Sequence, residues 1–370
     1  MEYRRALFIR FGGIGDIILA TPSVRALYNA FPGIVIDFIV GGGMIDALAG
    51  NPYVRNVIPF DKRGVDSRLD HFLPFLGRLS RMRYDLVINL HPSAKSYLMA
   101  SATGARRQLT FRKDMTVDPS TRRVRHAIHD FAKELGALGI DGVGEGLDFV
   151  IPDDARRSVD ELLRFSGVAA GSRIVVINPA ASRPINRWPT ERFKVIAEHF
   201  AAQLGTVVVV TGAPRSFRTE MDHADEVALA ADVAAVDPRI VSVAGKVTVK
   251  ELGALLARSA AFLTCDTGPM HVGAAVGAPM VVLAGAADPD RTGPRSRSSV
   301  VLIDESLPCV PCRSRSCARG DRLCMDNLAV DAVIGAINAK LRSAAPAVAG
   351  QTERNHERER RGVVLPVVPK

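Results

Sequence analysis

Seven short apolar segments, rich in Val and Ile, constrain the fold of this chain more than any other feature. They are residues 6–11, 34–40, 85–91, 173–179, 206–212, 260–266 and 279–285. Near-continuous apolar runs of this length are typical of parallel strands that are covered on both faces. Helical spacing of apolar residues lies between them, as at Val24, Leu27, Tyr28 and Phe31. The chain is therefore predicted to be an α/β protein in which strands and helices alternate through right-handed crossovers.

This alternation occurs twice along the chain. A charged helical pattern and the turn GVAAGS occupy residues 151–171, between the two series of strands. With 370 residues, 47% of them hydrophobic, the chain has enough apolar material for two cores. We predict one domain at residues 1–165 and a second at 166–342. Residues 343–370 contain small residues, Pro and the charged run ERNHERERR, and we predict that they are disordered.

A formal net charge of +9 favours an anionic partner. We expect no nucleic acid, because few aromatic residues are interleaved with the basic ones. An export signal is disfavoured because Arg10 and Asp16 interrupt the first apolar run. Residues 267–287 lack charged side chains, but their glycines and prolines favour a helix, a turn and a strand over a membrane span. The expected location is the cytoplasm, where structural disulfides are disfavoured.

The segment GGIGD follows the first predicted strand and opens a helix. Its glycines would let backbone amides at a helix N-terminus approach a phosphate. The third glycine of the dinucleotide fingerprint is replaced by Ile18, and Asp37, about 20 residues further on, lies within a strand rather than at its end. An NAD(P)-dependent Rossmann oxidoreductase is therefore weakened but stays open. Asp16 has two interpretations at this point, a helix cap or a chemical role.

A second motif, DTGPMH, follows the buried strand at residues 260–266. Asp266 ends this strand, and Thr267 and Gly268 lead into a helix that has Pro269 in or near its first turn. Free amides at such a position suit a diphosphate. The alternative is that Asp266 and Thr267 only cap the helix and that His271 packs inside.

Four of the five cysteines crowd into one loop with the spacing C-x2-C-x4-C-x6-C. They are Cys309, Cys312, Cys317 and Cys324. Four thiolates could complete a tetrahedral zinc site, whereas the alternative is reduced, partly buried thiols that shape a loop. A zinc-containing, non-enzymatic binding protein is accordingly the second alternative function. The α/β alternation along the whole chain counts against it.

These motifs together resemble family 9 glycosyltransferases, the bacterial ADP-heptose:lipopolysaccharide heptosyltransferases. The resemblance runs from about residue 5 to 342 and rests on GGIGDIILATPSVRAL, NPYVRNVIPFD, DLVINLH, NP…RWP, DTGPMHVGAAVGAP and the CxPC loop. It implies a GT-B fold, with two Rossmann-like doubly wound domains facing across a cleft, the first for the acceptor and the second for the nucleotide-sugar. It also implies metal-independent, inverting transfer of a heptose or related sugar from an ADP-activated donor to a lipopolysaccharide core, with no required cofactor.

The resemblance assigns a role to each matching residue. Asp16 matches the general base that takes the proton of the acceptor hydroxyl. Asn186 stands where the family usually has a Lys two residues before Trp-Pro, and the adjacent Arg187 could supply the missing cation. Glu220 resembles the acid that binds the adenosine ribose. The complete set of donor-binding positions is Gly13, Gly15, Asn186, Arg187, Glu220, Asp266, Thr267, Gly268 and His271.

The segment at residues 105–126 contains seven Arg or Lys residues. It is either a solvated loop or a contact for the phosphates and carboxylates of the lipopolysaccharide core, since Arg forks suit both groups. The candidate acceptor contacts are Arg106, Arg107, Arg122 and Arg123. Such an acceptor implies peripheral contact with the cytoplasmic face of the inner membrane. The exact donor sugar, the acceptor residue, its linkage and the oligomeric state stay open.

Overall fold

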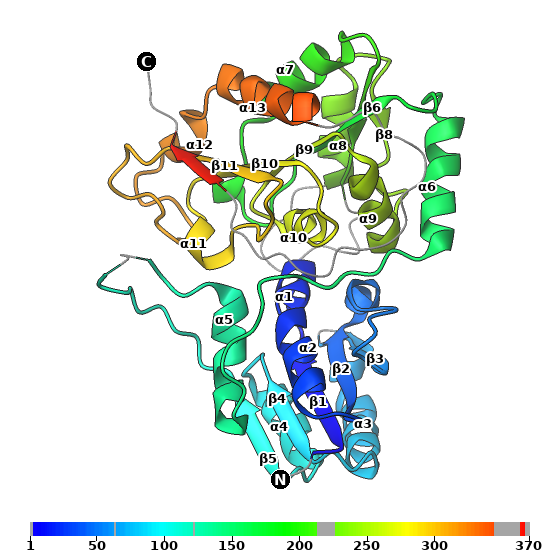
Figure 1. Ribbon diagram of the computed structural model, residues 1–370, viewed down its shortest axis with the longest axis vertical. Helices are drawn as coiled ribbons and strands as arrows, with labels where there is room; N and C mark the ends of the chain where they lie inside the picture. The colour runs from blue at the N-terminus through cyan, green and yellow to red at the C-terminus, as the bar shows by residue number, and fades with distance from the viewer. Residues whose placement is uncertain (1–2, 63, 121–122, 213–225, 344–362, 367–370) are drawn as a thin grey trace. The chain divides into compact units, whose positions relative to one another are not determined.

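A computed structural model describes residues 3–62, 64–120, 123–212, 226–343 and 363–366 of the chain (Figure 1). The chain divides into two compact units, Met1–Val150 and Ile151–Lys370. Each unit is built on one sheet of parallel strands. The alternation of strands and helices predicted from the sequence is thus confirmed in both halves.

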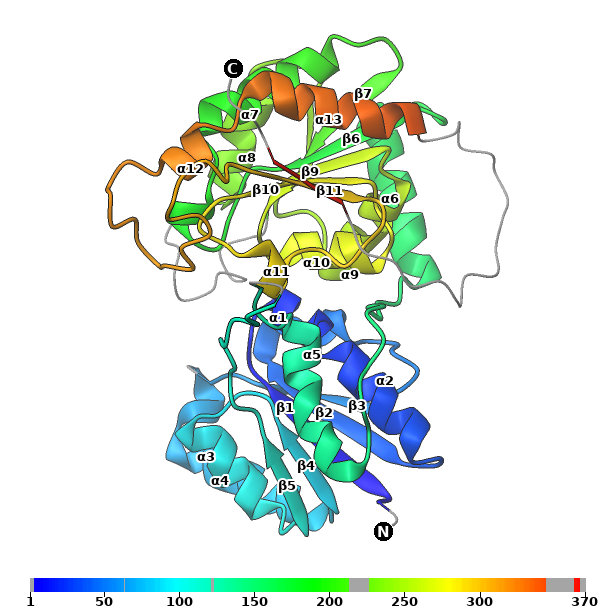
Figure 2. The same ribbon diagram turned by 60° about the vertical axis from the view of Figure 1, so that its left-hand side comes forward.

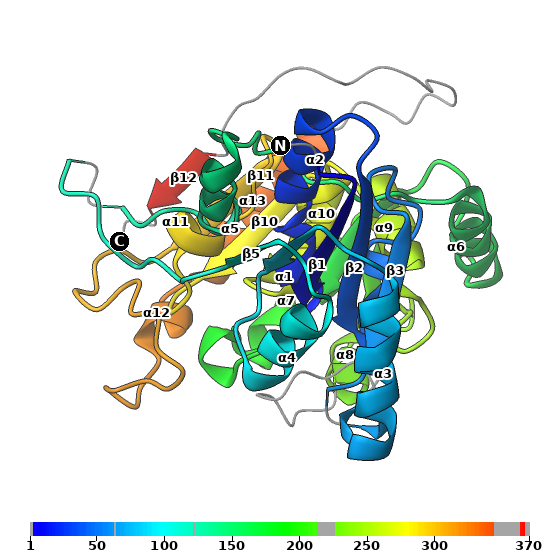
Figure 3. The ribbon, with the colours of Figure 1, turned by 90° about the horizontal axis from the view of Figure 1, so that it is seen from below.

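The first unit holds a five-stranded sheet in the order β3-β2-β1-β4-β5. Its strands are β1 (Arg5–Arg10), β2 (Val35–Gly41), β3 (Asn56–Phe60), β4 (Leu86–Asn89) and β5 (Arg107–Thr110). Its helices are α1 (Ile14–Ile18), α2 (Thr21–Ala30), α3 (Leu69–Arg81), α4 (Ala94–Ala102) and α5 (Ala127–Ala132), with 3-10 turns η1 (Gly42–Ala47), η2 (Val65–Ser67) and η3 (Lys133–Leu138). Figure 3 shows α3 and α4 on one face of this sheet, with α2 and α5 on the other.

Two hydrophobic clusters fill the first unit, one on each face of its sheet. Phe8 and Phe38 stack at 5.5 Å within the cluster that α2 and α5 cover. Phe60 packs against Phe72 and Phe75 of α3 in the other cluster. The inner strands β1, β2 and β4 are buried on both faces, which explains their near-continuous apolar sequences.

Asp37 is fully buried in β2 and has a structural role. Its carboxylate accepts hydrogen bonds from Asn56 at 2.9 Å and from Tyr84 at 2.8 Å, and pairs with Arg55 at 3.0 Å. Burial and the bond to Asp37 raise the pKa of the Tyr84 hydroxyl. These partners occupy the carboxylate inside the sheet, so Asp37 is not placed to bind a ribose.

The second unit holds a seven-stranded sheet in the order β12-β11-β10-β9-β6-β7-β8. Its strands are β6 (Arg173–Asn178), β7 (Thr206–Val210), β8 (Val241–Ser242), β9 (Ala261–Cys265), β10 (Met280–Ala284), β11 (Ser299–Ile303) and β12 (Val363–Pro366). Its helices are α6 (Asp153–Phe165), α7 (Thr190–Ala201), α8 (Glu226–Ala234), α9 (Val249–Arg258), α10 (Gly268–Ala275), α11 (Pro289–Thr292), α12 (Leu323–Asp326) and α13 (Val330–Ser343), with the 3-10 turn η4 (Pro184–Asn186). Figure 2 shows α7, α8 and α13 on one face of the sheet, with α9 and α10 on the other.

One large cluster, centred on the fully buried Trp188 and Phe193, fills the face under α7, α8 and α13. The Trp188 ring donates a hydrogen bond to the carbonyl oxygen of Leu328 at 3.2 Å, which ties the loop before α7 to the start of α13. The second unit therefore has a hydrophobic core of its own.

Two features differ from the sequence predictions. The helix α6 belongs to the second unit, whereas the predicted boundary placed it in the first, because α6 packs on α9 through the pairs Asp160–Arg258 and Ser158–Glu251. Strand β12 lies inside the segment 343–370 that was predicted to be disordered, and it pairs with β11. Residues 344–362 and 367–370 lie outside the described residues.

The uncharged segment at residues 267–287 forms α10, a turn and β10, as the sequence indicated. Among the helices of the described ranges, none combines the length and the apolar character that crossing a bilayer requires.

In each sheet the chain reverses its direction of winding once. The reversal lies between β1 and β4 in the first unit and between β6 and β9 in the second. Open α/β sheets bind their ligands outside the carboxyl ends of the strands that flank such a reversal. The loop GGIGD follows β1 and the motif DTGPMH follows β9, so both motifs stand at the expected ligand sites of their units.

Candidate active site

Asp16 lies in the first turn of α1, immediately after the carboxyl end of β1. The N-cap of this helix is Gly13, and no side chain caps it, so Asp16 is not the cap that the sequence left open. Its carboxylate pairs with Arg10 at 2.9 Å, and the Asp16 side chain stays 42% exposed while Arg10 is only 12% exposed. The carboxylate is therefore held in place by one cation and remains open to a ligand.

Gly12 is required by this placement of Asp16. A Cβ atom added at Gly12 would lie 2.3 Å from Oδ2 of Asp16 and 2.6 Å from its Cβ. Any other residue at position 12 would therefore displace the carboxylate or the loop that carries it.

Arg10 joins the two strands at which the first sheet reverses. Its guanidinium donates a hydrogen bond to the carbonyl oxygen of Leu90, just after β4, and lies 4.7 Å from the centre of the Phe131 ring. The adjacent His91 packs its ring against Phe11, with 5.2 Å between the ring centres. Arg10 and His91 were not identified as site residues from the sequence, although Arg10 lies in the first apolar segment and His91 ends DLVINLH.

Asp266 directly follows β9, one of the two strands at which the second sheet reverses. Thr292 donates a hydrogen bond from its hydroxyl to Oδ2 of Asp266 at 3.1 Å. Burial raises the pKa of the Asp266 carboxyl to about 6, while the Thr292 bond and Arg183 act against this shift and Asp288 adds to it. Asp266 therefore changes its charge close to neutral pH.

The loop between β6 and α7 brings two arginines towards the end of β9. The positive charge of Arg183 lowers the pKa of Asp266. Burial raises the pKa of the neighbouring Cys265 to about 12, and the positive charge of Arg187 acts against this rise. Asn186 is 8% exposed, and its Oδ1 has no hydrogen-bond partner within the described part of the chain. The cationic groups near the end of β9 are thus Arg187 and Arg183, of which sequence analysis named only Arg187.

The start of α10 agrees with the geometry predicted for DTGPMH. Thr267 is the N-cap in an extended conformation, and its side chain makes no capping hydrogen bond. Gly268 and Pro269 begin the first turn. The N-terminal end of α10 therefore presents backbone amide groups with little side-chain cover. His271 is only 5% exposed, which is the packed position that the alternative interpretation described.

The basic segment after α4 begins at the amino edge of the first sheet. Arg107 begins β5, and Arg106 pairs with Asp85, which precedes β4, at 3.5 Å. Since the strands are parallel, both arginines lie at the amino ends, on the edge opposite to Asp16. The structure does not bring these two candidates to the Asp16 site.

Of the three remaining candidates, the structure describes only Arg123. Arg123 lies beside a single antiparallel bridge between Val117 and Val124, where its carbonyl oxygen accepts a hydrogen bond from the amide of Asp118 at 2.8 Å. Arg122 and Glu220 lie outside the described residues.

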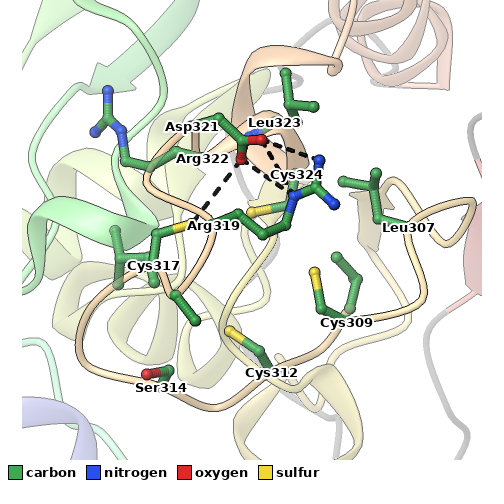
Figure 4. A pocket seen from close by; sticks show the side chains of 13 residues that line it. Leu307, Cys309, Cys312, Ser314, Cys317, Arg319, Asp321, Arg322, Leu323 and Cys324 are labelled. Atoms are coloured by element: carbon green, nitrogen blue, oxygen red, sulfur yellow. Dashed lines mark hydrogen bonds and ion pairs between the residues drawn. The ribbon is translucent and has the colours of Figure 1, made fainter.

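All four cysteines of the C-terminal loop line one cavity of about 70 Å³ (Figure 4). Burial and the other three thiols raise the pKa of Cys324, whereas backbone amides of Arg322, Arg319 and Gly320 lower that of Cys317. The cysteines are free thiols. Across the described ranges, however, no group of three or more His, Cys, Asp or Glu side chains is arranged to hold a metal ion. The predicted zinc site is therefore not supported.

The sequence of this chain is similar to those of known heptosyltransferases. The profile of glycosyltransferase family 9 (heptosyltransferase) matches residues 74–322. Lipopolysaccharide heptosyltransferase 1 of Pseudomonas aeruginosa is 26% identical over 323 residues, which cover 85% of this chain and 87% of that protein.

Two solved structures resemble the whole chain. The glycosyl transferase family 9 protein from Veillonella parvula superposes with a TM-score of 0.79 at 24% identity, covering 93% of this chain and 99% of that one. ADP-heptose lps heptosyltransferase II of E. coli gives a TM-score of 0.72 at 19% identity, covering 92% and 99%. At these identities the likeness shows the fold.

Proposed function

This chain belongs to glycosyltransferase family 9, the heptosyltransferases, and from that premise we propose that it transfers a heptose from an ADP-activated donor to a lipopolysaccharide core. Its fold is GT-B, with two Rossmann-like units, as the sequence predicted. The observation that carries the proposal is the position of two family motifs, GGIGD and DTGPMH, each at the winding reversal of its own sheet. Relatives named for ADP-heptose and for lipopolysaccharide support both substrates.

The alternative functions lose their support. A nicotinamide-dependent oxidoreductase needs an acidic residue to bind the ribose, and Asp37 was the candidate for this role. The Asp37 carboxylate instead accepts hydrogen bonds from Asn56 and Tyr84 inside the first unit. A zinc-containing binding protein needs a metal site, which the described residues do not form.

In the proposed reaction, Asp16 acts as the general base. An acceptor hydroxyl attacks the anomeric carbon of the donor, Asp16 takes the hydroxyl proton, and ADP departs with the electrons of the broken bond. Attack from the face opposite to ADP inverts the anomeric centre. The exposed carboxylate, fixed by its ion pair with Arg10, supports this role for Asp16.

The second unit would hold the nucleotide-sugar. Backbone amides at the start of α10, with Thr267 and Gly268, are proposed to meet the diphosphate. Arg183 and Arg187 would balance the charge that grows on the leaving ADP, the task for which the family uses a Lys where this chain has Asn186. Asp266 would contact the donor beside it, whereas the packed His271 is not proposed as a direct contact. Gly13 and Gly15 of the GGIGD loop are proposed as further donor-binding positions.

The acceptor is proposed to be the anionic core of a membrane glycolipid. The net charge of +9 supports peripheral contact with the cytoplasmic face of the inner membrane. Arg123 remains a proposed contact for its phosphates or carboxylates.

Incubation of the purified protein with ADP-heptose and a series of truncated lipopolysaccharides tests the function directly. Mass spectrometry is expected to show the addition of one heptose to one of the truncated acceptors. If ADP binds but no acceptor in the series gains a heptose, the proposed transfer is wrong.

Removal of either donor-site arginine is expected to weaken ADP binding. Arg183→Gln and Arg187→Gln each delete a charged hydrogen-bond donor, a loss that typically weakens affinity about 10- to 100-fold. The matched control is Arg173→Gln, because Arg173 begins β6 at the amino edge of the same sheet. Isothermal titration calorimetry measures the ADP affinity of all three variants and of the wild type. An unchanged affinity in both donor-site variants would exclude this placement of the diphosphate.

For the cysteine loop, we infer reduced thiols that shape the loop rather than a zinc site. Protein purified without chelators or a His tag is expected to contain less than about a tenth of an equivalent of zinc, since structural zinc sites bind tightly enough to stay filled. Elemental analysis measures the content. About one equivalent of zinc would restore the metal interpretation.

A further inference from the structure

The short helix α11, just after β10, is held by a compact set of interactions. Asp288 is its N-cap, and the Asp288 carboxylate accepts a hydrogen bond from the amide of Asp290 at 3.0 Å. The carbonyl oxygen of Asp288 also accepts from the amide of Thr292, at 3.0 Å. A Cβ atom added at Gly293 would lie 2.4 Å from the carbonyl oxygen of Pro289, so the turn closes tightly at both ends.

The cysteine loop holds this turn from a second side. Arg313, which directly follows Cys312, donates from Nε to the Asp288 carboxylate at 2.7 Å and from its amide to the carbonyl oxygen of Ala286 at 2.8 Å. The Asp288 side chain is 4% exposed in this pair. A buried, hydrogen-bonded ion pair of this kind fixes geometry, since breaking it would leave a buried charge.

Thr292 is the side chain that α11 directs at the end of β9. Its hydroxyl donates to Oδ2 of Asp266 at 3.1 Å, across 26 residues of sequence. The bond fixes one oxygen of the carboxyl group and leaves Oδ1 without a protein hydrogen-bond donor among the residues that the structure describes.

We propose that Thr292 is a positioning residue for donor recognition: it orients the Asp266 carboxyl, and the Asp288–Arg313 pair fixes the turn that carries it. The proposal rests on the proposed function, which assigns Asp266 to the ADP-sugar. Thr292 acts on the donor only through Asp266. A site that requires this orientation loses affinity when the hydroxyl is removed, even though the fold is kept.

The groups that face Asp266 determine how its charge responds to pH. Thr292 and Arg183 favour the carboxylate, whereas burial and Asp288 favour the neutral acid. Loss of the Thr292 hydroxyl therefore raises the pKa of Asp266 above about 6. The carboxylate would then form only at higher pH, so the acid limb of the pH profile would move upward.

The test compares wild type, Thr292→Val and Thr292→Ser in heptose transfer between about pH 5 and pH 8, with kcat and the KM for ADP-heptose measured separately. Val keeps the shape of Thr but removes the hydroxyl, and Ser keeps the hydroxyl. For Thr292→Val we expect about a 10-fold higher KM and an acid limb shifted upward by about one pH unit. Thr292→Ser is expected to restore both values.

Each outcome decides the inference. If Thr292→Val behaves as wild type, or if Val and Ser are equally impaired, the hydroxyl does not position Asp266. Thr292→Ala deletes the same hydroxyl without adding an apolar branch, so it supplies the same comparison if the Val variant fails to fold. A wild type that binds ADP but transfers no heptose would contradict the proposed function itself, and the inference would fall with it.

Discussion

Asp16→Asn is expected to lower the turnover of heptose transfer about 100- to 10,000-fold, which is the usual range for the loss of a general base. Asn has nearly the same shape as Asp but does not accept a proton under these conditions. The helix loses no cap, because Gly13 is the N-cap of α1. ADP affinity, measured by calorimetry, is expected to change little. Transfer is measured with ADP-heptose and the acceptor that the truncated series identifies.

Asp70→Asn is the matched control for this substitution. Asp70 also lies in the first turn of a helix, α3, and also pairs with an arginine, Arg68, at 3.2 Å. The control variant should therefore lose an exposed helix-start ion pair without loss of transfer. Near-normal transfer by Asp16→Asn, or an equal decrease in both variants, would contradict the assignment of Asp16 as the base.

Gly12→Ala is expected to reduce transfer about 100-fold although it removes no functional group. The new methyl group would lie 2.3 Å from Oδ2 of Asp16, so the carboxylate has to move. A misplacement of about 1 Å in a reacting group costs on the order of 100-fold in rate. The expected change in ADP affinity is much smaller than the change in turnover. Steady-state kinetics and calorimetry together separate the two effects.

Gly77→Ala supplies the control, since Gly77 lies within α3 and an added Cβ atom there meets nothing within 4 Å. Full activity of Gly12→Ala would show that the position of the Asp16 carboxylate does not matter for the reaction. A large loss in Gly12→Ala combined with normal activity in Asp16→Asn would instead assign the chemistry to another group.

The architecture could be predicted from the sequence because it follows from local patterns. Apolar runs of this length predict buried parallel strands, and the motifs GGIGD after β1 and DTGPMH after β9 mark the sites at the carboxyl ends. The domain to which α6 belongs could not be predicted from the sequence. The amphipathic pattern of α6 shows that one face is buried, but it does not show which sheet covers that face.

The residues that sequence analysis misplaced or missed depend on tertiary geometry. Arg106 and Arg107 looked suitable because of their charge, but the direction of β5 puts them at the amino edge of the sheet. Arg183, from the loop before α7, and Thr292, from α11, both act on Asp266, and no spacing in the sequence predicts that they come near it.

The separate cores around Phe8 and Trp188 affect how stability can be measured in this protein. Each unit closes its own hydrophobic interior, so each is able to melt as a cooperative block with its own enthalpy. A midpoint assigned to the whole chain then mixes two equilibria. A substitution in α1 acts on the core of the first unit, so calorimetric data for such a variant are fitted with two transitions rather than one.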